Sequence, residues 1–383
     1  MSKKTKELTA EQKEKFKNFK RKLYSIGHRS RPCARIITEA LCLTMPLRRD
    51  QSPQKLKEIM ETYIPEEKQR DRRYMERMKR DLLFSRMVYN TRYTDYFIYG
   101  FDKLNDTGRR EYVGWYDVGA YTDRCRKTGD TYRIFLNKYE TYCRFREFFG
   151  REMVPIRDAS DRGAFVRFAE KHRVFILKPE AMLQGIGIEK IDLDHGGETA
   201  ESVFERVMAR GKSHVAEEWI RQGQEMARLH PASINTVRVA TFQRNGELTV
   251  LFCWVKAGTG GAYMDQTRSN GLCAAVDPDT GIVLTPGYRL AEMKPYLKHP
   301  DTGVQIIGMQ LPQWEELKAL VRRLVQVVPE QTYVGWDLAF SEDGWILVEA
   351  NDDGAVHHVQ AYLHQGMRDL FNRTFGADKS EIK

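Results

Sequence analysis

Long apolar runs are missing from this sequence. No stretch of its 383 residues approaches the roughly 18 apolar residues that a membrane-spanning helix needs. The segment from Ile36 to Leu47 comes nearest, but it contains Glu39 and begins too late to be the apolar core of a signal peptide. We therefore expect a cytoplasmic protein.

Paired cysteines are missing too. Six cysteines are present, and none forms a Cys-x-x-Cys pair or lies at zinc-ligand spacing from a histidine. In a chain of this length they are typical of reduced, mostly buried thiols. Nothing in the sequence supports a catalytic cysteine, and no convincing Ser–His set offers another covalent nucleophile.

The common glycine-rich nucleotide motifs are absent. The stretch Gln184-Gly185-Ile186-Gly187-Ile188 fits neither the dinucleotide-binding nor the P-loop spacing. Glycines at these positions still allow backbone N–H groups to approach phosphate oxygens closely. The pattern also occurs in ordinary turns, so by itself it does not establish a phosphate site.

Excess charge is confined to one end of the chain. Residues 1–35 hold 12 Lys and Arg and 3 acids, a net charge of +9, and the remainder holds 62 − 12 = 50 basic and 53 − 3 = 50 acidic residues. A balanced body argues against a nucleic-acid-binding protein. The arm is either a solvated helix or a contact for an anionic membrane surface or an acidic partner.

The order of helical and strand-like segments predicts an α+β chain with several parts. Residues 1–90 are helical in pattern, and Glu66 to Asn90 reads as one long charged helix with an apolar stripe. Strands dominate from Ser233 onward, with a hairpin around Asn245-Gly246. The expected divisions are 1–90, 91–136, 137–222 and 223–383, and the chain is expected to fade into a terminus from Phe371.

The stretch from Gly335 to Asn351 is the most informative. Its two apolar runs flank a turn signal and predict a hairpin. A three-residue loop ending at a left-handed Gly344 would pair Ser341 with Trp345. The outward face would then carry acids, and the opposite face would be apolar through Leu338, Phe340, Ile346 and Val348.

In that register Asp337 lies opposite Glu349, and period-two alternation places Asn351 on the same face. Two carboxylates and an amide oxygen are ligands suited to Mg²⁺, usually together with substrate phosphates. The alternative is an exposed hairpin with solvated acids. The strongly apolar opposite face favours a hairpin in the core.

Further positions fit a nucleotide site, and each also has a structural interpretation. Lys178 ends an apolar strand and could bind phosphate or be solvated at a sheet edge. Glu217 and Glu218 close a strand whose end could hold a flat heterocycle or simply be capped. Arg238 lies within an apolar strand and therefore needs an anion, either a protein carboxylate or a phosphate.

The order lysine, glycine-rich loop, strand-end acids, buried arginine and Asp-x₁₁-Glu-x-Asn resembles the ATP-grasp superfamily. The phrases His230-Pro-Ala-Ser-Ile-Asn-Thr-Val-Arg238 and Val334-Gly-Trp-Asp337 are similar to its sugar-transfer-associated branch. The resemblance covers roughly residues 90–362. It implies an ATP-grasp fold with a helical N-terminal region, a small α+β lid subdomain and a C-terminal mixed or antiparallel sheet domain.

The resemblance also implies roles for individual residues, with ATP and Mg²⁺ (or Mn²⁺) as cofactors. The nucleotide would be bound by Lys138, Lys178, Gln184, Gly185, Gly187, Glu217, Glu218, Ile220 and Asn235. Arg238, with Lys178, would act near the transferred phosphoryl group, and the metal would be bound by Asp337, Glu349 and Asn351. The chain departs from the family in having only two lid glycines, and in carrying Lys256 where relatives often have arginine.

The reaction implied is an ADP-forming ligation of a small carboxylate, through its acyl phosphate, to an amine or related nucleophile, with the branch name suggesting a sugar-linked substrate of a surface polysaccharide. Acceptor contacts are expected from Asp265, Arg268, Asn270, His357 and His358, although the two histidines could equally be a solvated helix start. A kinase using Asp265 or Asp353 as general base, or an ATP-binding protein without turnover, are the alternatives.

Overall fold

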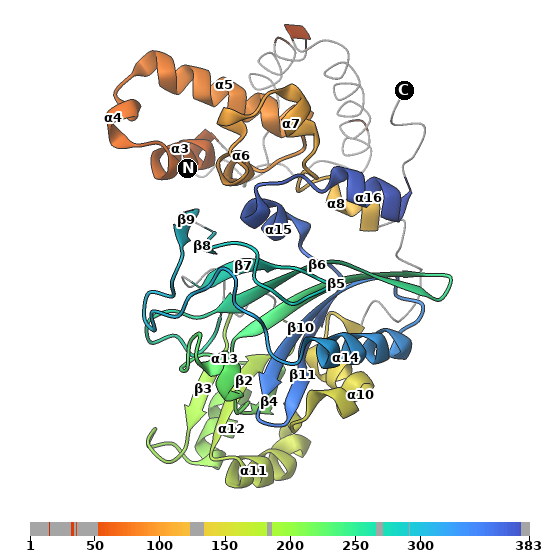
Figure 1. Cartoon of the computed structure of the whole chain (residues 1–383). Coiled ribbons are helices and arrows are strands. Elements are labelled where there is room, and N and C mark those ends of the chain that lie inside the picture. The colour runs from red at the N-terminus through yellow and green to blue at the C-terminus, as the bar shows by residue number, and fades with distance from the viewer. Residues whose placement is uncertain are drawn as a thin grey trace. The chain divides into compact units, whose positions relative to one another are not determined.

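The computed structural model describes residues 15, 32–33, 36, 53–122, 134–181, 186–265, 271–290 and 292–376. The chain divides into two compact units, one formed by residues 1–121 with 364–383 and the other by residues 122–363. In the described residues the first unit is helical, and the second contains two antiparallel sheets (Figure 1). None of the helices described combines the length and the apolar character that crossing a bilayer requires.

Short helices make up the described part of the first unit. They are α3 (Pro53–Tyr63), α4 (Glu66–Gln69), α5 (Arg72–Val88), α6 (Tyr93–Ile98), α7 (Asp106–Arg110), α8 (Val118–Thr122) and α16 (Arg368–Phe375), with a 3-10 turn η2 at Phe101–Lys103. The predicted single helix from Glu66 to Asn90 is interrupted. The Asp71 carboxylate starts α5 anew by accepting hydrogen bonds from the amides of Arg73 and Tyr74 at 2.9 and 3.1 Å.

A buried ion pair and a returning helix stabilise this unit. The Arg109 guanidinium donates to both oxygens of Asp81 at 2.9 and 2.7 Å, and the Tyr96 hydroxyl donates to the same carboxylate at 2.7 Å. Phe371 on α16 is fully buried, and the Tyr121 hydroxyl donates to Asn372 at 2.6 Å. The expectation of a fading terminus is therefore wrong for residues 371–375, whereas residues 377–383 lie outside the described part.

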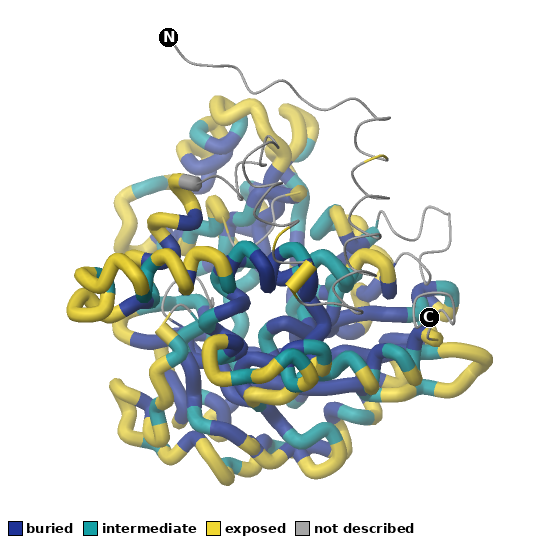
Figure 2. Tube along the Cα trace, turned by 90° about the horizontal axis from the view of Figure 1, so that it is seen from above, coloured by how far each residue is buried: buried dark blue, intermediate teal, exposed yellow. Residues whose placement is uncertain are grey.

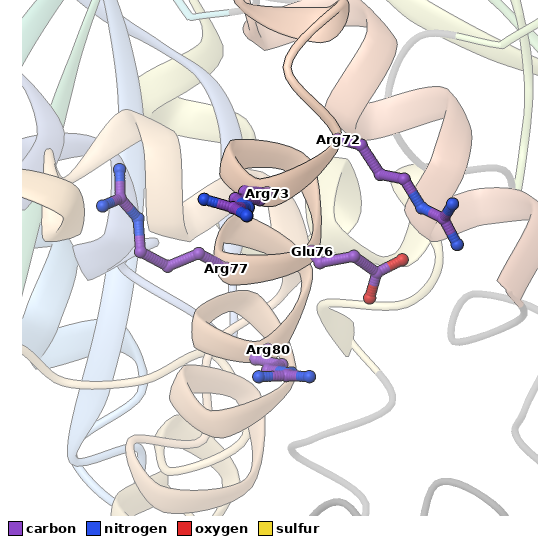
Figure 3. Close-up of a pocket in the computed structure, with 5 residues that line it drawn as sticks. All are labelled: Arg72, Arg73, Glu76, Arg77 and Arg80. Atoms are coloured by element: carbon purple, nitrogen blue, oxygen red, sulfur yellow. The ribbon is translucent and has the colours of Figure 1, made fainter.

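Exposed arginines on α5 line a cavity of about 530 Å³ in the same unit (Figure 3). Its lining side chains are Arg72, Arg73, Glu76, Arg77 and Arg80. Four guanidinium groups against one carboxylate favour anions there. None of the predicted site residues lines this cavity, and most of the predicted basic arm, residues 1–35, lies outside the described residues.

A four-stranded antiparallel sheet with the strand order β1-β4-β2-β3 forms one part of the second unit. Its elements are β1 (Met153–Ile156), η3 (Ala159–Asp161), α11 (Arg162–Lys171), β2 (Val174–Pro179), β3 (Glu189–Asp192), α12 (Ala200–Met208) and β4 (His214–Glu218). Phe165 and Val203 from the helices bury against Phe175 of β2. The strand and helix predicted at Val174 to Lys178 and Asp161 to Lys171 are confirmed to within a residue.

A seven-stranded antiparallel sheet forms the other part, in the order β11-β10-β5-β6-β7-β8-β9. Its strands are β5 (Thr236–Arg244), β6 (Glu247–Ala257), β7 (Leu272–Val276), β8 (Gly287–Arg289), β9 (Lys294–Tyr296), β10 (Tyr333–Ser341) and β11 (Gly344–Asn351). The hairpin predicted around Asn245-Gly246 is confirmed. Both turn residues have positive φ, 54° and 83°, as a tight two-residue turn requires.

The two faces of this sheet differ in chemistry. One face is apolar and packs on α10 (Lys138–Phe149) and α14 (Trp314–Val327), with Trp336, Leu338 and Leu324 in its core. The buried stretches appear dark blue in Figure 2. The opposite face carries the charged residues of the hairpin, and α15 (Val356–Leu363) contacts β6 and β7 there. A short helix, α13 (Gln224–Ala227), precedes β5.

Candidate functional site

Strand register aligns four side chains in one row across the sheet. Asp337 on β10 lies opposite Glu349 on β11 and opposite Arg238 on β5. Arg238 in turn lies opposite Trp254 on β6. Directly opposed residues project from the same face, so an acid, an acid, a base and an aromatic ring form a continuous row. Lys256, two residues beyond Trp254, is on the same face.

The turn of the metal-ligand hairpin is shorter than predicted. Ser341 pairs with Gly344, not with Trp345, so the loop has two residues and the predicted three-residue loop is wrong. Gly344 does have the positive φ expected of it, 106°. The predicted pairing of Asp337 with Glu349 is nevertheless present.

A β-bulge reconciles the two observations. Continued unchanged, the turn register would place Asp337 opposite Val348 and would put Glu349 on the apolar face. The register shifts between Asp337 and Leu338, which leaves Val348 as the extra residue. The bulge therefore brings Glu349 and Asn351 onto the face of Asp337.

The same shift corrects the predicted apolar face of the hairpin. Leu338 and Phe340 are buried as expected, but their partners are Leu347 and Trp345. Ile346, which was expected on that face, pairs with Ala339 instead. Sequence alternation alone places these residues wrongly because it does not register an extra residue in the strand.

Asp337 is buried and fully engaged by neighbours. Its Oδ1 accepts from Arg238 Nε at 2.7 Å and from Lys256 Nζ at 3.0 Å. Its Oδ2 accepts from Arg238 Nη2 at 2.7 Å and faces Asn351 Nδ2 at 3.5 Å. Burial would raise the pKa of this carboxyl, but the two cations outweigh it and hold the pKa well below the usual range. A carboxylate offers about four acceptor positions, and all four are used here.

Arg238 finds its anion in a protein carboxylate, which was one of the two predicted outcomes. Burial would lower its pKa, but Asp337 raises it overall. The remaining Nη1 donates to the Asp353 carbonyl at 3.1 Å. Gly335 makes room for this contact, because a Cβ there would lie 2.5 Å from the Asp353 oxygen and 3.0 Å from Arg238 Nη1. The loop after Asn351 is thus fixed to the sheet.

The end of β4 contains a second buried carboxylate between two cations. Glu217 forms ion pairs with Lys178 on the neighbouring strand and with Arg151, whose Nε donates to it at 2.6 Å. Burial would raise the pKa of Glu217, but Arg151 and Lys178 lower it to about 2. In this structure Glu217 therefore holds Lys178. Its predicted contact with adenine stays a prediction.

The other residues predicted to hold adenine are less enclosed. The Glu218 amide donates to the Glu152 carbonyl, and the Glu218 carboxylate accepts from the Glu152 amide, each at 3.0 Å. Glu218 therefore caps the strand end. Ile220, just beyond β4, is partly exposed. Within the described residues its backbone N–H makes no hydrogen bond. This N–H is therefore available to donate to a bound heterocycle.

Lys138 begins α10 and lies within electrostatic reach of both sheets. Asn137 caps the helix by accepting from the Glu140 amide at 3.0 Å. Burial lowers the pKa of Lys138, and Lys178 lowers it further, whereas Glu349 has the opposite effect. The two lysines predicted to bind phosphate and a predicted metal ligand therefore influence one another.

Four predicted positions lie outside the described residues: Gln184, Gly185, Arg268 and Asn270. Their roles stay predictions. Gly187 is described and has a positive φ of 78°, and a Cβ there would lie 2.9 Å from Pro179 Cγ. Only glycine suits that position without strain.

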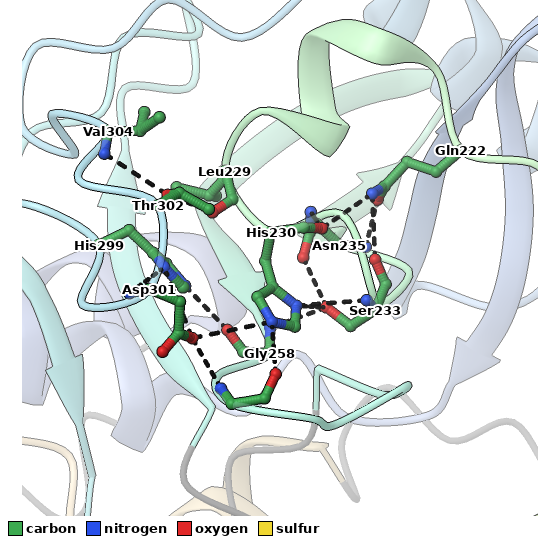
Figure 4. Close-up of polar contacts among 11 residues, drawn as sticks. Gln222, Leu229, His230, Ser233, Asn235, Gly258, His299, Asp301, Thr302 and Val304 are labelled. Carbon is green, nitrogen blue, oxygen red and sulfur yellow. Dashed lines mark hydrogen bonds and ion pairs between the residues drawn. The ribbon is translucent and has the colours of Figure 1, made fainter.

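Asn235 is buried within a structural network (Figure 4). Its Oδ1 accepts from Ser233 Oγ at 2.9 Å, and its Nδ2 donates to the carbonyls of Met226 and His230 at 2.9 and 2.8 Å. Its backbone amide donates to Gln222 at 2.5 Å. These bonds use the side chain for the entry into β5, and its predicted nucleotide contact stays a prediction.

The same network fixes the glycine-rich loop after β6. Side chains of this network bond the backbone of Gly258 (Figure 4) and of Gly260. The Gly258 amide donates to Ser233 Oγ at 3.0 Å, and the Gly258 carbonyl accepts from His299 Nε2 at 2.9 Å. The Gly260 amide donates to the Asp301 carboxylate at 2.6 Å, and the Gly260 carbonyl accepts from His230 Nε2 at 3.0 Å. Burial lowers the pKa of His299, so it favours the neutral ring that this bonding uses. These bonds fix the backbone of the loop at Gly258 and Gly260.

Asp265 is a predicted acceptor residue that lies within electrostatic reach of Lys256 and Asp337. It is buried and accepts from the Thr236 amide and hydroxyl at 2.9 and 2.5 Å. Burial raises its pKa, and Lys256 only partly offsets the effect. A carboxyl in this setting gains a proton more readily than an exposed one.

The two histidines are at the start of α15, as predicted. His357 is buried, so the alternative of a solvated position is wrong for it. The ring of His358 stacks on Trp254 at 5.4 Å, and its Nδ1 bonds the Tyr362 hydroxyl at 2.8 Å. His358 therefore covers the aromatic end of the row.

Arg151 was not predicted as a functional residue. It bridges the two sheets through Glu217 on one and the Leu347 carbonyl on the other, 2.7 Å away. The only local signal is its place after Gly150, which ends α10 with a φ of 58°. Its partners are 66 and 196 residues away in sequence, so no local pattern identifies it.

Solved structures and one family model are similar to this chain. No curated protein matches it in sequence. Among solved structures, D-alanyl-alanine synthetase A from Vibrio cholerae matches at 11% identity and a TM-score of 0.39, over 64% of this chain and 66% of that one. An L-amino acid ligase from Bacillus licheniformis matches at 14% identity and a TM-score of 0.37, over 65% and 50%.

An N5-carboxyaminoimidazole synthase from Aspergillus clavatus, solved with ADP and 5-aminoimidazole ribonucleotide, matches at 12% identity and a TM-score of 0.35, over 61% of this chain and 52% of that one. The chain thus spans half to two thirds of these structures. The sequence match to a family model is more specific. The model for sugar-transfer-associated ATP-grasp covers residues 170–375, more than half of the chain. The chain belongs to the sugar-transfer-associated ATP-grasp family.

Proposed function

We propose that this chain is an ATP- and Mg²⁺-dependent, ADP-forming ligase that joins a small carboxylate to an amine or related nucleophile, one of them carried on a sugar or surface-polysaccharide precursor. One observation carries the proposal most directly. The bulge in β11 brings Glu349 and Asn351 to the face that already holds Asp337, Arg238 and Lys256. Family membership supports the use of ATP at this face.

The residues present fit a magnesium ion in part. Glu349 is partly exposed and forms no hydrogen bond or ion pair within the described residues, so both its oxygens are available. Asn351 directs its amide nitrogen at Asp337, which leaves its oxygen for a cation. Asp337 could join only by giving up one of its present donors, most easily Lys256. A bound Mg²⁺ would supply charge neutralisation for the phosphates.

Three lysines would neutralise the rest of the nucleotide. Lys178 is paired with Glu217, and Lys256 is paired with Asp337. A phosphate would compete with those carboxylates for the ammonium groups. Two cations, Arg238 and Lys256, are paired with one carboxylate, Asp337. These three side chains together carry a net charge of 2 − 1 = +1 near the reacting phosphate.

The proposed chemistry is balanced without a covalent enzyme intermediate. A substrate carboxylate oxygen attacks the γ-phosphorus, the bond to the bridging β–γ oxygen breaks, and ADP leaves. The amine then attacks the acyl carbon, inorganic phosphate leaves, and the amine proton passes to solvent. Positioning and fixed charges would supply most of the rate, as in phosphoryl transfer generally.

A kinase is the second candidate because of one observation. The raised pKa of Asp265 is a property of general bases, although its two bonds to Thr236 argue for a structural role. In that reaction a hydroxyl oxygen would attack the γ-phosphorus and Asp265 would take its proton. The two reactions differ in their products.

The test is ADP release with Mg·ATP and a panel of amino acids, uronic acids and nucleotide sugars. A ligase releases ADP only when a carboxylate and an amine are both present, and Glu349→Ala abolishes that release. Glu342→Ala removes an exposed acid from the turn of the same hairpin and serves as the matched control. Release with a hydroxyl acceptor alone would establish the kinase, and full activity of Glu349→Ala would contradict the metal assignment.

A further inference from the structure

Arg151 uses its whole guanidinium group to connect the two sheets of the second unit. Its side chain is 2% exposed. Nε donates to Glu217 at 2.6 Å, and Nη1 donates to the carbonyls of Phe149 at 2.8 Å and Leu347 at 2.7 Å. Nη2 reaches the Val348 carbonyl at 3.4 Å. One side chain therefore bonds a carboxylate of one sheet and two successive carbonyls of the other.

Those two carbonyls belong to the bulge. Val348 is its extra residue, and Leu347 is the last residue that follows the turn register. An extra residue disrupts the ladder locally and leaves backbone groups that need other partners. Arg151 supplies those partners. Because the bulge decides which face Glu349 occupies, the contacts of Arg151 help to fix the position of that carboxylate.

The other end of the guanidinium controls a lysine. Glu217 is shared between Arg151 and Lys178, and within the described residues these are its only ion-pair partners. A phosphate that attracts Lys178 away from Glu217 leaves Arg151 as the only cation on that carboxylate. Glu217 would then bind Arg151 more strongly, at the same guanidinium that holds the bulge.

We propose that Arg151 is a positioning residue that couples nucleotide binding at Lys178 to the placement of Glu349 through the bulge of β11. The inference rests on the proposed function, since it needs a nucleotide and a metal at this face. Arg151 would touch neither of them. Its effect passes through Glu217 on one side and through the Leu347 and Val348 carbonyls on the other.

Two substitutions separate the two sides of this link. Arg151→Lys keeps a cation for Glu217, but a single ammonium group cannot also span the two bulge carbonyls. Arg151→Met removes both connections. We expect ADP affinity to be little changed in the lysine variant and Mn²⁺ affinity in the presence of ADP to fall about tenfold or more. Both affinities should fall in the methionine variant.

The measurements are titration calorimetry of ADP without metal and electron paramagnetic resonance of Mn²⁺, so neither needs the acceptor substrate. Gln243→Met is the matched control. Gln243 Nε2 also holds three carbonyls, those of Val325, Val328 and Gln331, at 3.1–3.2 Å. Within the described residues its side chain bonds none of the charged row, so its loss should lower stability and leave both affinities unchanged.

A purely structural role for Arg151 would lower both affinities together in the lysine variant, and that outcome would overturn the proposal. Unchanged Mn²⁺ affinity in the lysine variant would do so as well. If that variant does not fold, Glu217→Gln tests the other side: it releases Lys178 and breaks the link to Arg151 but leaves the carbonyl bonds in place, so ADP should bind at least as tightly and should no longer raise the Mn²⁺ affinity. An effect of ADP on the Mn²⁺ affinity as large as in the wild type would overturn the coupling. Absence of ADP binding in the wild-type chain would instead overturn the proposed function.

Discussion

Each sheet of the second unit contains one buried carboxylate held between an arginine and a lysine. Asp337 lies between Arg238 and Lys256 in the seven-stranded sheet. Glu217 lies between Arg151 and Lys178 at the four-stranded sheet. In both cases the cations outweigh the effect of burial and lower the pKa of the carboxyl. The two sites differ in where the arginine comes from.

Both partners of Asp337 belong to strands of its own sheet, Arg238 to the adjacent β5 and Lys256 to β6 beyond it, so the backbone ladder fixes them. Arg151 belongs to no strand and reaches from the α10–β1 segment to both sheets. Two similar groups of one carboxylate and two cations therefore have different structural roles. A change at Asp337 should disturb one sheet, whereas a change at Glu217 should disturb the connection between the sheets.

Asp337→Asn should produce the largest loss of stability. It leaves Arg238 and Lys256 buried without a carboxylate, and breaking a buried pair costs about 3–5 kcal/mol. Urea unfolding at neutral pH measures the loss. Asp343→Asn, in the exposed turn of the same hairpin, is the control and should cost little. A loss below about 1 kcal/mol at Asp337 would mean that the cations find water, as surface pairs do.

Glu217→Gln should cost somewhat less and should do so in a pH-dependent way. The pKa of Glu217 is lowered from 4.5 to about 2, so its ionised form stabilises the fold. That stabilisation, about 3 kcal/mol, is fully present above the unfolded pKa of 4.5 and is lost as the pH falls towards 2. The difference in unfolding free energy between wild type and variant should narrow below pH 4.5. A constant difference would contradict the assignment.

Gly335→Ala tests the seven-stranded sheet without changing a charge. The added Cβ would lie 2.5 Å from the Asp353 oxygen, and that backbone group cannot move aside easily. Overpacking of this kind costs about 1–3 kcal/mol. Gly261→Ala has open space around its Cβ and serves as the control. Equal urea midpoints for the two variants would show that the loop after Asn351 is free to shift.

The sequence was sufficient for much of the fold because local signals specify it. The Asn245-Gly246 turn and the flanking alternation predict β5 and β6 correctly. The helix cap at Asp71 was missed, although an aspartate before a helical run is a recognised signal. The return of α16 to the helical unit was not predicted, because burial of Phe371 depends on residues such as Tyr121, far away in sequence.

The site was predicted in part, and for an instructive reason. Asp337 and Glu349 do share a face, but through a bulge that corrects a wrong loop length. The bulge is stabilised by Arg151, 196 residues from Leu347, and no local pattern encodes that contact. Likewise Arg238 and Asp337 meet only because two strands 99 residues apart pair in one register. The chemical type of a site residue can be recognised from the local sequence, whereas its contact partners depend on how distant segments fold together.

Glu147→Gln should have the smallest effect and completes the comparison of the two triads. It makes the same chemical change as Glu217→Gln, at a carboxylate paired with Arg323 at 3.1 Å, but both side chains are mostly exposed, 68% and 64%. Water screens such a pair, so we expect a loss of about 0.5 kcal/mol or less in urea unfolding. Arg323 keeps its packing on the Phe148 ring, 4.8 Å away, so only the ion pair changes. A loss as large as that at Glu217 would show that burial is not what distinguishes the triads, and the contrast between the two sheets would then need another cause.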